Sequence, residues 1–329
     1  MSRAQLTSTV EQNSAGAAAP VVAGKNKIIN GDMSVAQRGS SVTYSGTDAY
    51  GLDRWYLSGY GSGQSFVASQ QTSTAPTGAR YYQRIVQSSA NSTNIFVLTN
   101  LETTDVVKFA GQTVTLSFQY RNVVNSTNTW SASAVYSTAT DGNLKPANSP
   151  TTITSVSLTN NSSWTSKSIT FSVPSTATSF AIQFGTANST VSGSQFEFTN
   201  VQVEIGSVAT PFTTATGTLQ GELAACNYYF RVFGAGCIGI NEASTALDYS
   251  FTFDGGGMRT VPALTLFSTS ANNFNWGVGT TAYTITSITG NTLTNKGGYL
   301  SLNTSNSGIS TAGKVVTLLT NNFAASAEL

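Results

Sequence analysis

The chain contains no histidine and only two cysteines among its 329 residues. A serine or cysteine nucleophile therefore lacks its usual histidine base, and two cysteines cannot supply the four ligands of a structural zinc site. Cys226 and Cys237 are also too few for a disulfide scaffold, and we expect both to be small buried hydrophobes rather than a bridge. These absences exclude the commonest hydrolase triads and zinc-dependent chemistry.

Charge is scarce as well, at 9% of the residues, with 15 basic and 14 acidic side chains. Proteins that bind nucleic acid normally present a field of Lys and Arg, so this balance argues against a nucleic-acid partner. No apolar run approaches the ~18 residues of a membrane helix, so we expect no membrane insertion. Polar residues at 11–13 (EQN) interrupt the position where a secretory signal would have its apolar core.

Short hydroxyl side chains are abundant, since Ser and Thr together number 93. Hydrophobic residues make up 40% of the chain and the net charge is +1, which does not fit the charged, apolar-poor composition of disordered proteins. Apolar and polar residues alternate in 113–120 (TVTLSFQY), 168–174 (SITFSVP), 179–184 (SFAIQF) and 195–205 (QFEFTNVQVEI). Alternation of this kind indicates strands with one buried face. The pattern predicts an all-β protein built as an antiparallel β-sandwich of the jelly-roll kind.

Turn-forming and apolar residues locate the connections between these strands. We expect exposed loops at 137–150 and 185–194, which are rich in Gly, Asn and Ser. One helix is predicted within 213–231, because Leu219, Leu223 and Cys226 follow at helical spacing after Thr216 or Thr218, either of which suits the N-cap. Strand patterns return after this helix and indicate a second β-sandwich domain.

Phrases spread along the chain resemble, in the same order, those of a carbohydrate-binding-module-like jelly roll found in bacteriophage tail-fibre and other virion structural proteins. They are 26–33 (NKIINGDM), 51–57 (GLDRWYL), 200–212 (NVQVEIGSVATPF), 222–229 (ELAACNYY), 258–264 (MRTVPAL) and 324–329 (AASAEL). The match at 222–229 is partial, because Asn227 stands where the family has Gln-Arg. The resemblance covers residues 26–329, nearly the whole chain.

The patterns and the resemblance together predict four parts of the chain. These are an N-terminal virion-docking arm (1–25), a jelly roll (26–212), a connecting helix (213–231) and a C-terminal β domain at the distal tip (232–329). The resemblance implies a non-enzymatic fibre subunit, a homotrimer assembled in the host cytoplasm, whose arm contacts other virion proteins. It also implies attachment to host cell-surface polysaccharide.

Two alternatives stay open. One is a capsid decoration or head-fibre protein without a receptor role. The other is a carbohydrate-binding module of a glycan-active enzyme.

Sugar binding relies on aromatic faces and on polar groups that orient hydroxyls. The candidates in polar, Gly-, Asn- and Ser-rich surroundings are Tyr60, Trp130, Tyr136, and Trp276 with its neighbour Asn275. Each could equally be structural, and Trp276 could pack in a trimer. Trp55 and Trp164 are instead expected in the core.

Glycoside hydrolysis would need two carboxylates on either side of the sugar bond. The candidates that could meet in space are Asp53, Glu102, Asp105, Glu197 and Glu204. The favoured interpretation is structural, with Asp53 paired to Arg54 or another neighbour and with Glu197 and Glu204 facing solvent. We therefore predict no catalytic residue and no enzyme.

The resemblance also implies a structural calcium near the first strand. Asp32 is its candidate ligand, since calcium takes carboxylate and carbonyl oxygens. Ser34 stands where the family often has Glu, which departs from that pattern. No other cofactor is expected.

Overall fold

The computed structural model describes residues 23–60, 65–88, 93–124, 129–189, 192–233, 238–243, 246–253, 257–266, 274–276, 285–304, 315–318 and 323–329. Most of the predicted arm, 1–25, lies outside these residues. The chain divides into two compact units. The first consists of Met1–Ser34, Thr43–Ala49 and Leu57–Glu222, and the second of Val35–Val42, Tyr50–Tyr56 and Leu223–Leu329. Two short segments from the N-terminal region therefore belong to the second unit.

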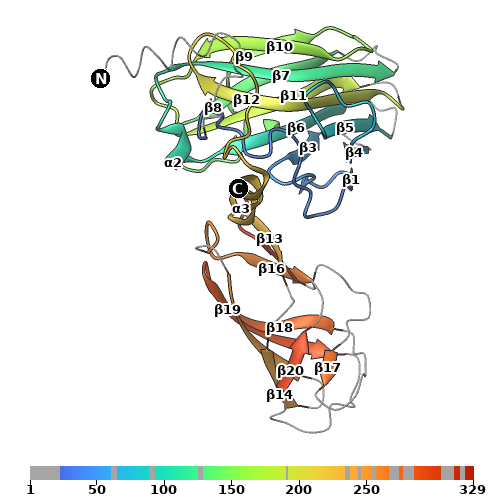
Figure 1. Cartoon of the computed structure of the whole chain (residues 1–329), viewed down its shortest axis with the longest axis vertical. Coiled ribbons are helices and arrows are strands. Elements are labelled where there is room, and N and C mark those ends of the chain that lie inside the picture. The colour runs from blue at the N-terminus through green and yellow to red at the C-terminus, as the bar shows by residue number, and fades with distance from the viewer. Residues whose placement is uncertain are drawn as a thin grey trace, which may run out of the picture. The chain divides into compact units, whose positions relative to one another are not determined.

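Strands β1 to β12 form two six-stranded sheets, with the orders β1-β4-β5-β12-β7-β10 and β2-β3-β6-β11-β8-β9 (Figure 1). Neighbouring strands run antiparallel in the pairs β4–β5, β5–β12, β12–β7 and β7–β10 of the first sheet and β6–β11, β11–β8 and β8–β9 of the second. The bounds are β1 Ser41–Tyr44, β2 Ala49–Tyr50, β3 Tyr56–Tyr60, β4 Phe66–Gln71, β5 Tyr82–Gln87, β6 Thr93–Leu101, β7 Thr113–Val124, β8 Trp130–Ser137, β9 Thr151–Leu158, β10 Thr165–Ser172, β11 Ser179–Ser189 and β12 Gln195–Ile205.

Aromatic side chains fill the space between these two sheets. The ring of Phe118 on β7 meets that of Phe184 on β11, with centroids 5.0 Å apart. Trp130 on β8 stacks on Phe196 of β12, with centroids 4.3 Å apart. Each pair joins one sheet to the other, so the strands form a sandwich with an aromatic core, as predicted from the alternation.

The alternating runs are strands with their apolar residues inward. On β7 the side chains of Val114, Leu116, Phe118 and Tyr120 are all buried. The loop predicted at 137–150 is confirmed, because it joins β8 to β9 and contains only the short η1 (Pro146–Asn148). The loop predicted at 185–194 is wrong in its first half, since β11 continues to Ser189 while pairing with β6 on one side and β8 on the other.

The predicted helix is present as α3, Leu219–Asn227. Thr218 is its N-cap, because its Oγ1 accepts a hydrogen bond from the Gly221 N–H at 3.0 Å. The helix ends before 231, since Phe230 begins a strand. The sequence did not predict the single-turn α2 (Thr103–Val106). No helix in the described part is long and apolar enough to cross a membrane.

Two further sheets belong to the C-terminal part, a three-stranded one with the order β13-β21-β16 and a six-stranded one with the order β17-β20-β14-β15-β19-β18. Their bounds are β13 Phe230–Phe233, β14 Ile238–Ala243, β15 Ala246–Thr252, β16 Ala263–Leu266, β17 Phe274–Trp276, β18 Ile285–Thr294, β19 Gly297–Thr304, β20 Val315–Leu318 and β21 Phe323–Ser326. The buried core of this unit consists of Phe251, Phe253, Met258, Leu300, Leu302, Phe323, Ala325 and Ala327. Cys226 is buried as predicted, and Cys237 lies outside the described residues.

Two of the matching phrases lie against each other in the first unit. The Asn26 side chain donates to the Val201 carbonyl at 3.1 Å and accepts from the Val203 N–H at 3.1 Å. A Cβ on Gly31 would lie 2.2 Å from the Val201 carbonyl oxygen, so only glycine fits there. The phrase at 26–33 therefore fixes the backbone of β12, which carries the start of the phrase at 200–212.

The second unit contains a buried cluster around Glu328. This carboxylate pairs with Arg54 at 2.5 Å and with Arg38 at 3.2 Å. The Arg54 guanidinium lies 3.5 Å from the centroid of the Tyr229 ring, and that of Arg38 lies 3.6 Å from the Phe230 ring. The cluster thus joins the phrase at 51–57 to those at 222–229 and 324–329.

Candidate functional site

The predicted aromatic residues have different environments. Trp130 is 2% exposed and stacked in the core, so it offers no face to a ligand and leaves the candidate set. Tyr136 lies six residues further along β8 and is half-buried at the surface. Tyr60 is the last residue of β3, and Asn275 and Trp276 belong to β17, but their side chains lie outside the described residues.

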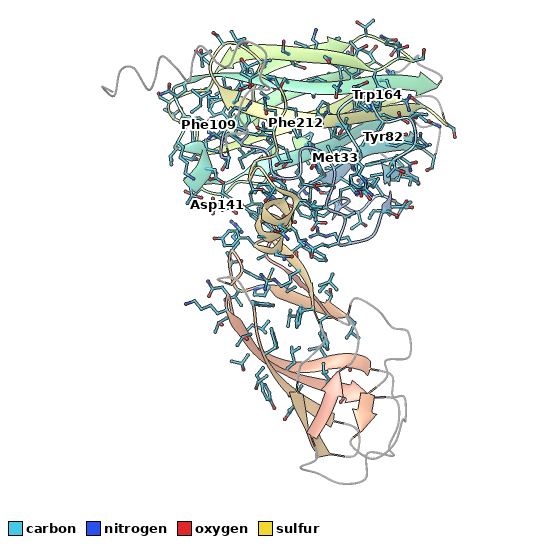
Figure 2. All side chains as sticks on the ribbon, viewed as in Figure 1. Met33, Tyr82, Phe109, Asp141, Trp164 and Phe212 are labelled. Atoms are coloured by element: carbon cyan, nitrogen blue, oxygen red, sulfur yellow. The ribbon has the colours of Figure 1, made fainter. Side chains whose placement is uncertain are left out.

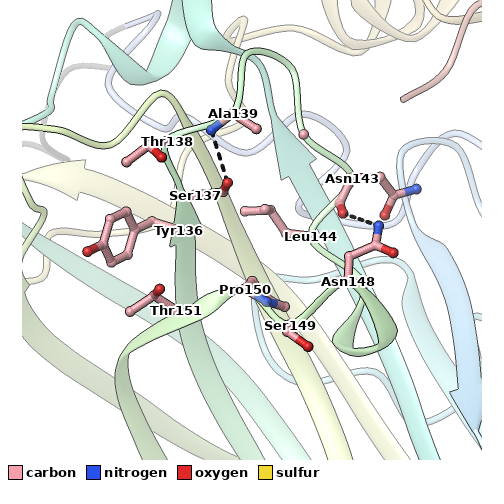
Figure 3. Close-up of a pocket in the computed structure, with 11 residues that line it drawn as sticks. Tyr136, Ser137, Thr138, Ala139, Asn143, Leu144, Asn148, Ser149, Pro150 and Thr151 are labelled. Atoms are coloured by element: carbon pink, nitrogen blue, oxygen red, sulfur yellow. Dashed lines mark hydrogen bonds between the residues drawn. The ribbon is translucent and has the colours of Figure 1, made fainter.

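A pocket of about 300 Å³ opens beside Tyr136 (Figure 3). Its wall is the loop between β8 and β9, which the sequence predicted as an exposed loop. The lining residues are Tyr136, Ser137, Thr138, Ala139, Gly142, Asn143, Leu144, Asn148, Ser149, Pro150 and Thr151. None of them carries a charge, so the pocket is polar but neutral.

Internal hydrogen bonds hold the loop in place. The Ser137 hydroxyl accepts from the Ala139 N–H at 3.0 Å, and the Asn148 side chain donates to the Asn143 carbonyl at 2.7 Å (Figure 3). On the other side of the loop, the Gly142 N–H donates to the Ser179 hydroxyl at 2.8 Å. These bonds preform the pocket, so a ligand would not have to order it.

The side of the pocket next to the Tyr136 ring is available to a ligand. Thr151 lies opposite Tyr136 across β8 and β9, and in Figure 3 Thr138 and Thr151 flank the ring. The hydroxyls of Tyr136, Thr138 and Thr151 have no protein partner among the described residues. An aromatic face bordered by hydroxyls is the combination that can stack on a sugar ring and hydrogen-bond its edge.

The carboxylates considered for catalysis have structural partners. Glu197 does not face solvent, as the sequence had suggested, but is fully buried and paired with Arg84 at 2.6 Å and with Arg121. Glu204 is also buried, at 2% exposed, and accepts from the Thr210 N–H at 2.8 Å and its hydroxyl at 2.7 Å. The prediction that both face solvent is therefore wrong. Strict alternation would also place residues seven positions apart on opposite faces, and the register shift between Thr199 and Gln202 brings both glutamates to the same face of the sheet.

The other three acids differ in burial. Asp53 pairs with neighbours, as expected: its carboxylate accepts from the Gln37 N–H at 2.7 Å and from the Gln37 side chain at 2.9 Å, and it lies 3.8 Å from the Arg38 guanidinium. Burial raises the pKa of Asp53, and the nearby Arg38 and the bonds from Gln37 oppose that shift. Glu102 is buried just before α2, whereas the Asp105 side chain is 40% exposed and pairs with Lys108 at 2.8 Å.

Asp32, the candidate calcium ligand, is half-buried. Its Oδ1 accepts from the Ser34 hydroxyl at 2.9 Å. In the described part of the chain, no three His, Cys, Asp or Glu side chains are grouped closely enough to hold a metal ion. A calcium ion held by Asp32 would therefore take most of its other ligands from backbone carbonyl, amide or hydroxyl oxygens.

Trp164 is not a core residue, contrary to the prediction. It is half-buried on the outer face of the first sheet, where its indole N–H donates to the Thr74 carbonyl at 2.7 Å. The Arg121 guanidinium lies 4.8 Å from its ring centroid, and the Tyr82 ring meets it edge-on at 5.2 Å. A Trp at the start of an alternating run had suggested burial, but its position in the register puts it on the outer face.

No protein-family model matches the chain, and no curated protein matches it in sequence. Among solved structures it is similar to the enzymatically active domain of tailspike protein 4 of bacteriophage CBA120, at 12% identity and TM-score 0.38, over 55% of this chain but only 22% of that one. It is also similar to the CBM22-1 xylan-binding domain of Paenibacillus barcinonensis Xyn10C, at 12% identity and TM-score 0.32, over 51% of this chain and 95% of that one. It is similar as well to the C-terminal family 22 carbohydrate-binding module of Clostridium thermocellum Xyn10B, at 14% identity and TM-score 0.34, over 53% of this chain and 99% of that one. Because these TM-scores are below 0.5, the function of this chain has to be argued from its own residues.

Proposed function

We propose that this chain is a non-enzymatic subunit of a bacteriophage virion fibre that attaches to glycans on the host surface. The observation that carries the proposal is the neutral pocket beside Tyr136, where the tyrosine ring of β8 lies between Thr138 of the preformed loop and Thr151 of β9 (Figure 3). The ordered phrases that resemble virion proteins support the location. The hydroxyl-rich, weakly charged composition also suits an external appendage.

The chemistry needs no reacting group. A sugar ring would lie against the Tyr136 ring through its C–H face, while Thr138 and Thr151 would bond its hydroxyls. A single shallow contact of this kind binds weakly. In a homotrimeric fibre anchored through residues 1–25, several copies would engage one polysaccharide, and the effective concentration of the linked sites would strengthen attachment.

Adsorption of the purified protein to host cells tests the proposal. The wild-type protein should adsorb and should compete with phage particles for the cell surface. Tyr136→Ala should reduce adsorption at least tenfold, because it removes the stacking face, while the unfolding midpoint stays close to wild type because the side chain is at the surface.

Two controls separate the alternatives. Tyr136→Phe keeps the ring and should retain most of the adsorption, so that a loss equal to that of Tyr136→Ala would count against stacking. A wild-type protein that does not adsorb would favour the capsid decoration or head-fibre alternative. Release of soluble sugars from isolated host polysaccharide would instead favour an enzyme.

Trp276 and Asn275 give the proposal a second location, on β17 of the second unit. Trp276→Ala should abolish adsorption and leave the melting temperature within about two degrees if the indole contacts the glycan. A large loss of stability with unchanged adsorption would assign Trp276 to packing.

A further inference from the structure

A second cavity, of about 350 Å³, lies on the outer face of the first sheet over β7 and β10. We call it the β7–β10 groove. Its lining consists of Ser117, Phe118, Gln119, Ser166, Lys167, Ser168, Asn200, Ala209, Thr210, Pro211 and Phe212. Nothing in the sequence marked this place as a site.

Strand register decides which side chains face the groove. Gln119 pairs with Ser166, and Ser117 pairs with Ser168, in the antiparallel β7–β10 ladder. Phe118 lies between them and points into the core, where it is 2% exposed, so it lines the groove through its backbone. Lys167 pairs with Phe118 and therefore shares its side of the sheet, away from the groove. The groove floor is thus neutral and consists of hydroxyls and an amide.

An irregularity in β12 brings a second amide to the groove. The register of β12 against β7 shifts between Thr199 and Gln202, and Asn200 within that shift has a φ of 53°. Such bulges re-aim side chains, and Asn tolerates the left-handed conformation. The Asn200 side chain consequently reaches across to β7 and donates from Nδ2 to Gln119 Oε1 at 2.7 Å.

This bond uses one polar atom of each amide and leaves a donor on Gln119 and an acceptor on Asn200. Among the described residues, Gln119 Nε2 and Asn200 Oδ1 have no partner, and neither do the hydroxyls of Ser117, Ser166 and Ser168. Two neighbouring sugar hydroxyls can each donate and accept, so a paired amide donor and acceptor is complementary to a vicinal diol.

The far wall of the groove, 209–212, is rigidly held. The Thr210 N–H donates to the buried Glu204 at 2.8 Å, and the Thr213 N–H donates to the buried Gln202 side chain at 3.0 Å. The wall places the half-buried ring of Phe212 at the groove. At the other end, Trp164 precedes Ser166 by two positions on the same face, which is about 7 Å along a strand. Trp164 and Phe212 are both labelled on the sandwich in Figure 2.

We infer that the β7–β10 groove binds a neutral hexopyranosyl polysaccharide, with Gln119 and Asn200 recognising a vicinal diol and with Phe212 packing against the sugar ring. This site is separate from the Tyr136 pocket and rests on the proposed function only in taking a glycan as ligand. No charged side chain belongs to the floor. Lys25 donates to the Thr210 hydroxyl and to the Pro211 carbonyl of the wall, but it pairs with the buried Glu204 at 3.8 Å, so its charge is balanced and the groove favours a neutral sugar.

Affinity electrophoresis of the full chain through gels that contain glucomannan, galactan or dextran tests the inference. At least one of these neutral polysaccharides should retard the wild-type protein. Gln119→Ala and Asn200→Gly should each weaken that retardation about tenfold, the loss expected for one or two hydrogen bonds to a neutral ligand. Glycine suits the positive φ of residue 200, so the second variant should fold.

The matched control is Gln112→Ala, which removes an exposed glutamine outside the groove and should leave retardation unchanged. Equal retardation of Gln119→Ala, Asn200→Gly and Gln112→Ala would overturn the inference. A wild-type protein that none of the three gels retards would also overturn it.

Host-cell adsorption tests the proposed function separately. Adsorption that Tyr136→Ala abolishes and Gln119→Ala leaves intact would support the proposed function alone. Retardation that depends on Gln119 without any adsorption would support the groove alone.

Discussion

Glu197 and Glu328 are both buried glutamates with two arginine partners, but they join different kinds of segments in the two units. Glu197 lies on β12 between Arg84 on β5 and Arg121 on β7, so it joins strands that are already neighbours in one sheet. Glu328 joins Arg38 and Arg54, which lie 290 and 274 residues away in the sequence. The first cluster reinforces a sheet that hydrogen bonds already define, whereas the second holds together segments that no sheet in the described residues joins to one another.

The arginines differ in their access to water, and this difference predicts unequal costs. The Arg54 side chain is 3% exposed, whereas that of Arg84 is 26% exposed. An arginine that loses its partner can rehydrate at the surface but not in the interior, so the Glu328 cluster should be the more sensitive of the two.

Glu328→Ala should have the largest effect. It leaves the buried Arg54 without its carboxylate, and removing one partner of a buried pair typically costs about 3–5 kcal/mol. Hydrogen exchange followed by mass spectrometry should show faster exchange in 50–56 and 323–329, with β5 and β12 unchanged. Faster exchange throughout the chain would contradict the local role.

Glu197→Ala should cost less, about 1–3 kcal/mol, because Arg84 and Arg121 reach water. The loss should appear in the exchange of β5, β7 and β12. Asp105→Ala serves as the control for both glutamates, since it breaks an exposed pair with Lys108 and should change stability by less than about 0.5 kcal/mol. A Glu197→Ala variant less stable than Glu328→Ala would reverse the comparison.

Asp53 should make the stability of the second unit depend on pH. Burial raises its pKa above the ordinary value of 3.8, so protonation is easier in the folded protein than in the unfolded one. The stabilisation that protonated Asp53 gives the folded state is therefore complete below pH 3.8, and it is lost as the pH rises through the pKa of the folded protein. Asp53→Asn keeps an acceptor for Gln37 and removes the titration, so its unfolding free energy relative to wild type should increase as the pH rises from 3.8. A difference that is flat with pH would contradict the shift.

Gln119→Ala and Tyr136→Ala should have the smallest effects on stability. Gln119→Ala should cost about 1 kcal/mol, because it removes the acceptor of the Asn200 amide, and Tyr136→Ala less than about 0.5 kcal/mol, because that side chain is at the surface. Chemical denaturation should give Tyr136→Ala the midpoint of the wild type. A large loss of stability in either variant would mean that the substituted residue supports the fold. The contrast between buried clusters and open sites would then not hold.

Sequence patterns predicted the framework better than the sites. Alternation identified β7 and β10, and Thr218 was correctly a candidate N-cap. The helix end was wrong because Phe230 pairs with Ser326 of β21, a contact 96 residues distant that local spacing does not encode. Trp164 was assigned to the core because a single sequence does not reveal which face of an edge strand is covered.

The candidate sites depended even more on tertiary structure. Tyr136 and the loop at 137–150 were both named from composition, and the fold brings them together in one pocket. The β7–β10 groove was missed, since it depends on a register shift at Asn200 that interrupts an otherwise regular alternation. The phrase at 200–212 resembles virion proteins, but that resemblance gave no indication that residues 209–212 form a wall of the groove.

The pairing of Arg54 with Glu328 also sets an order of events during synthesis. A ribosome adds about 5–20 residues per second, so the 274 residues between the two partners take roughly 14–55 s to make. Arg84, Arg121 and Glu197 are all present once residue 197 has been made, whereas Arg54 still lacks Glu328 for another 131 residues (328 − 197). The sandwich can therefore fold while the chain is still being synthesised. The second unit can complete its Glu328 cluster only after residue 328 has been added.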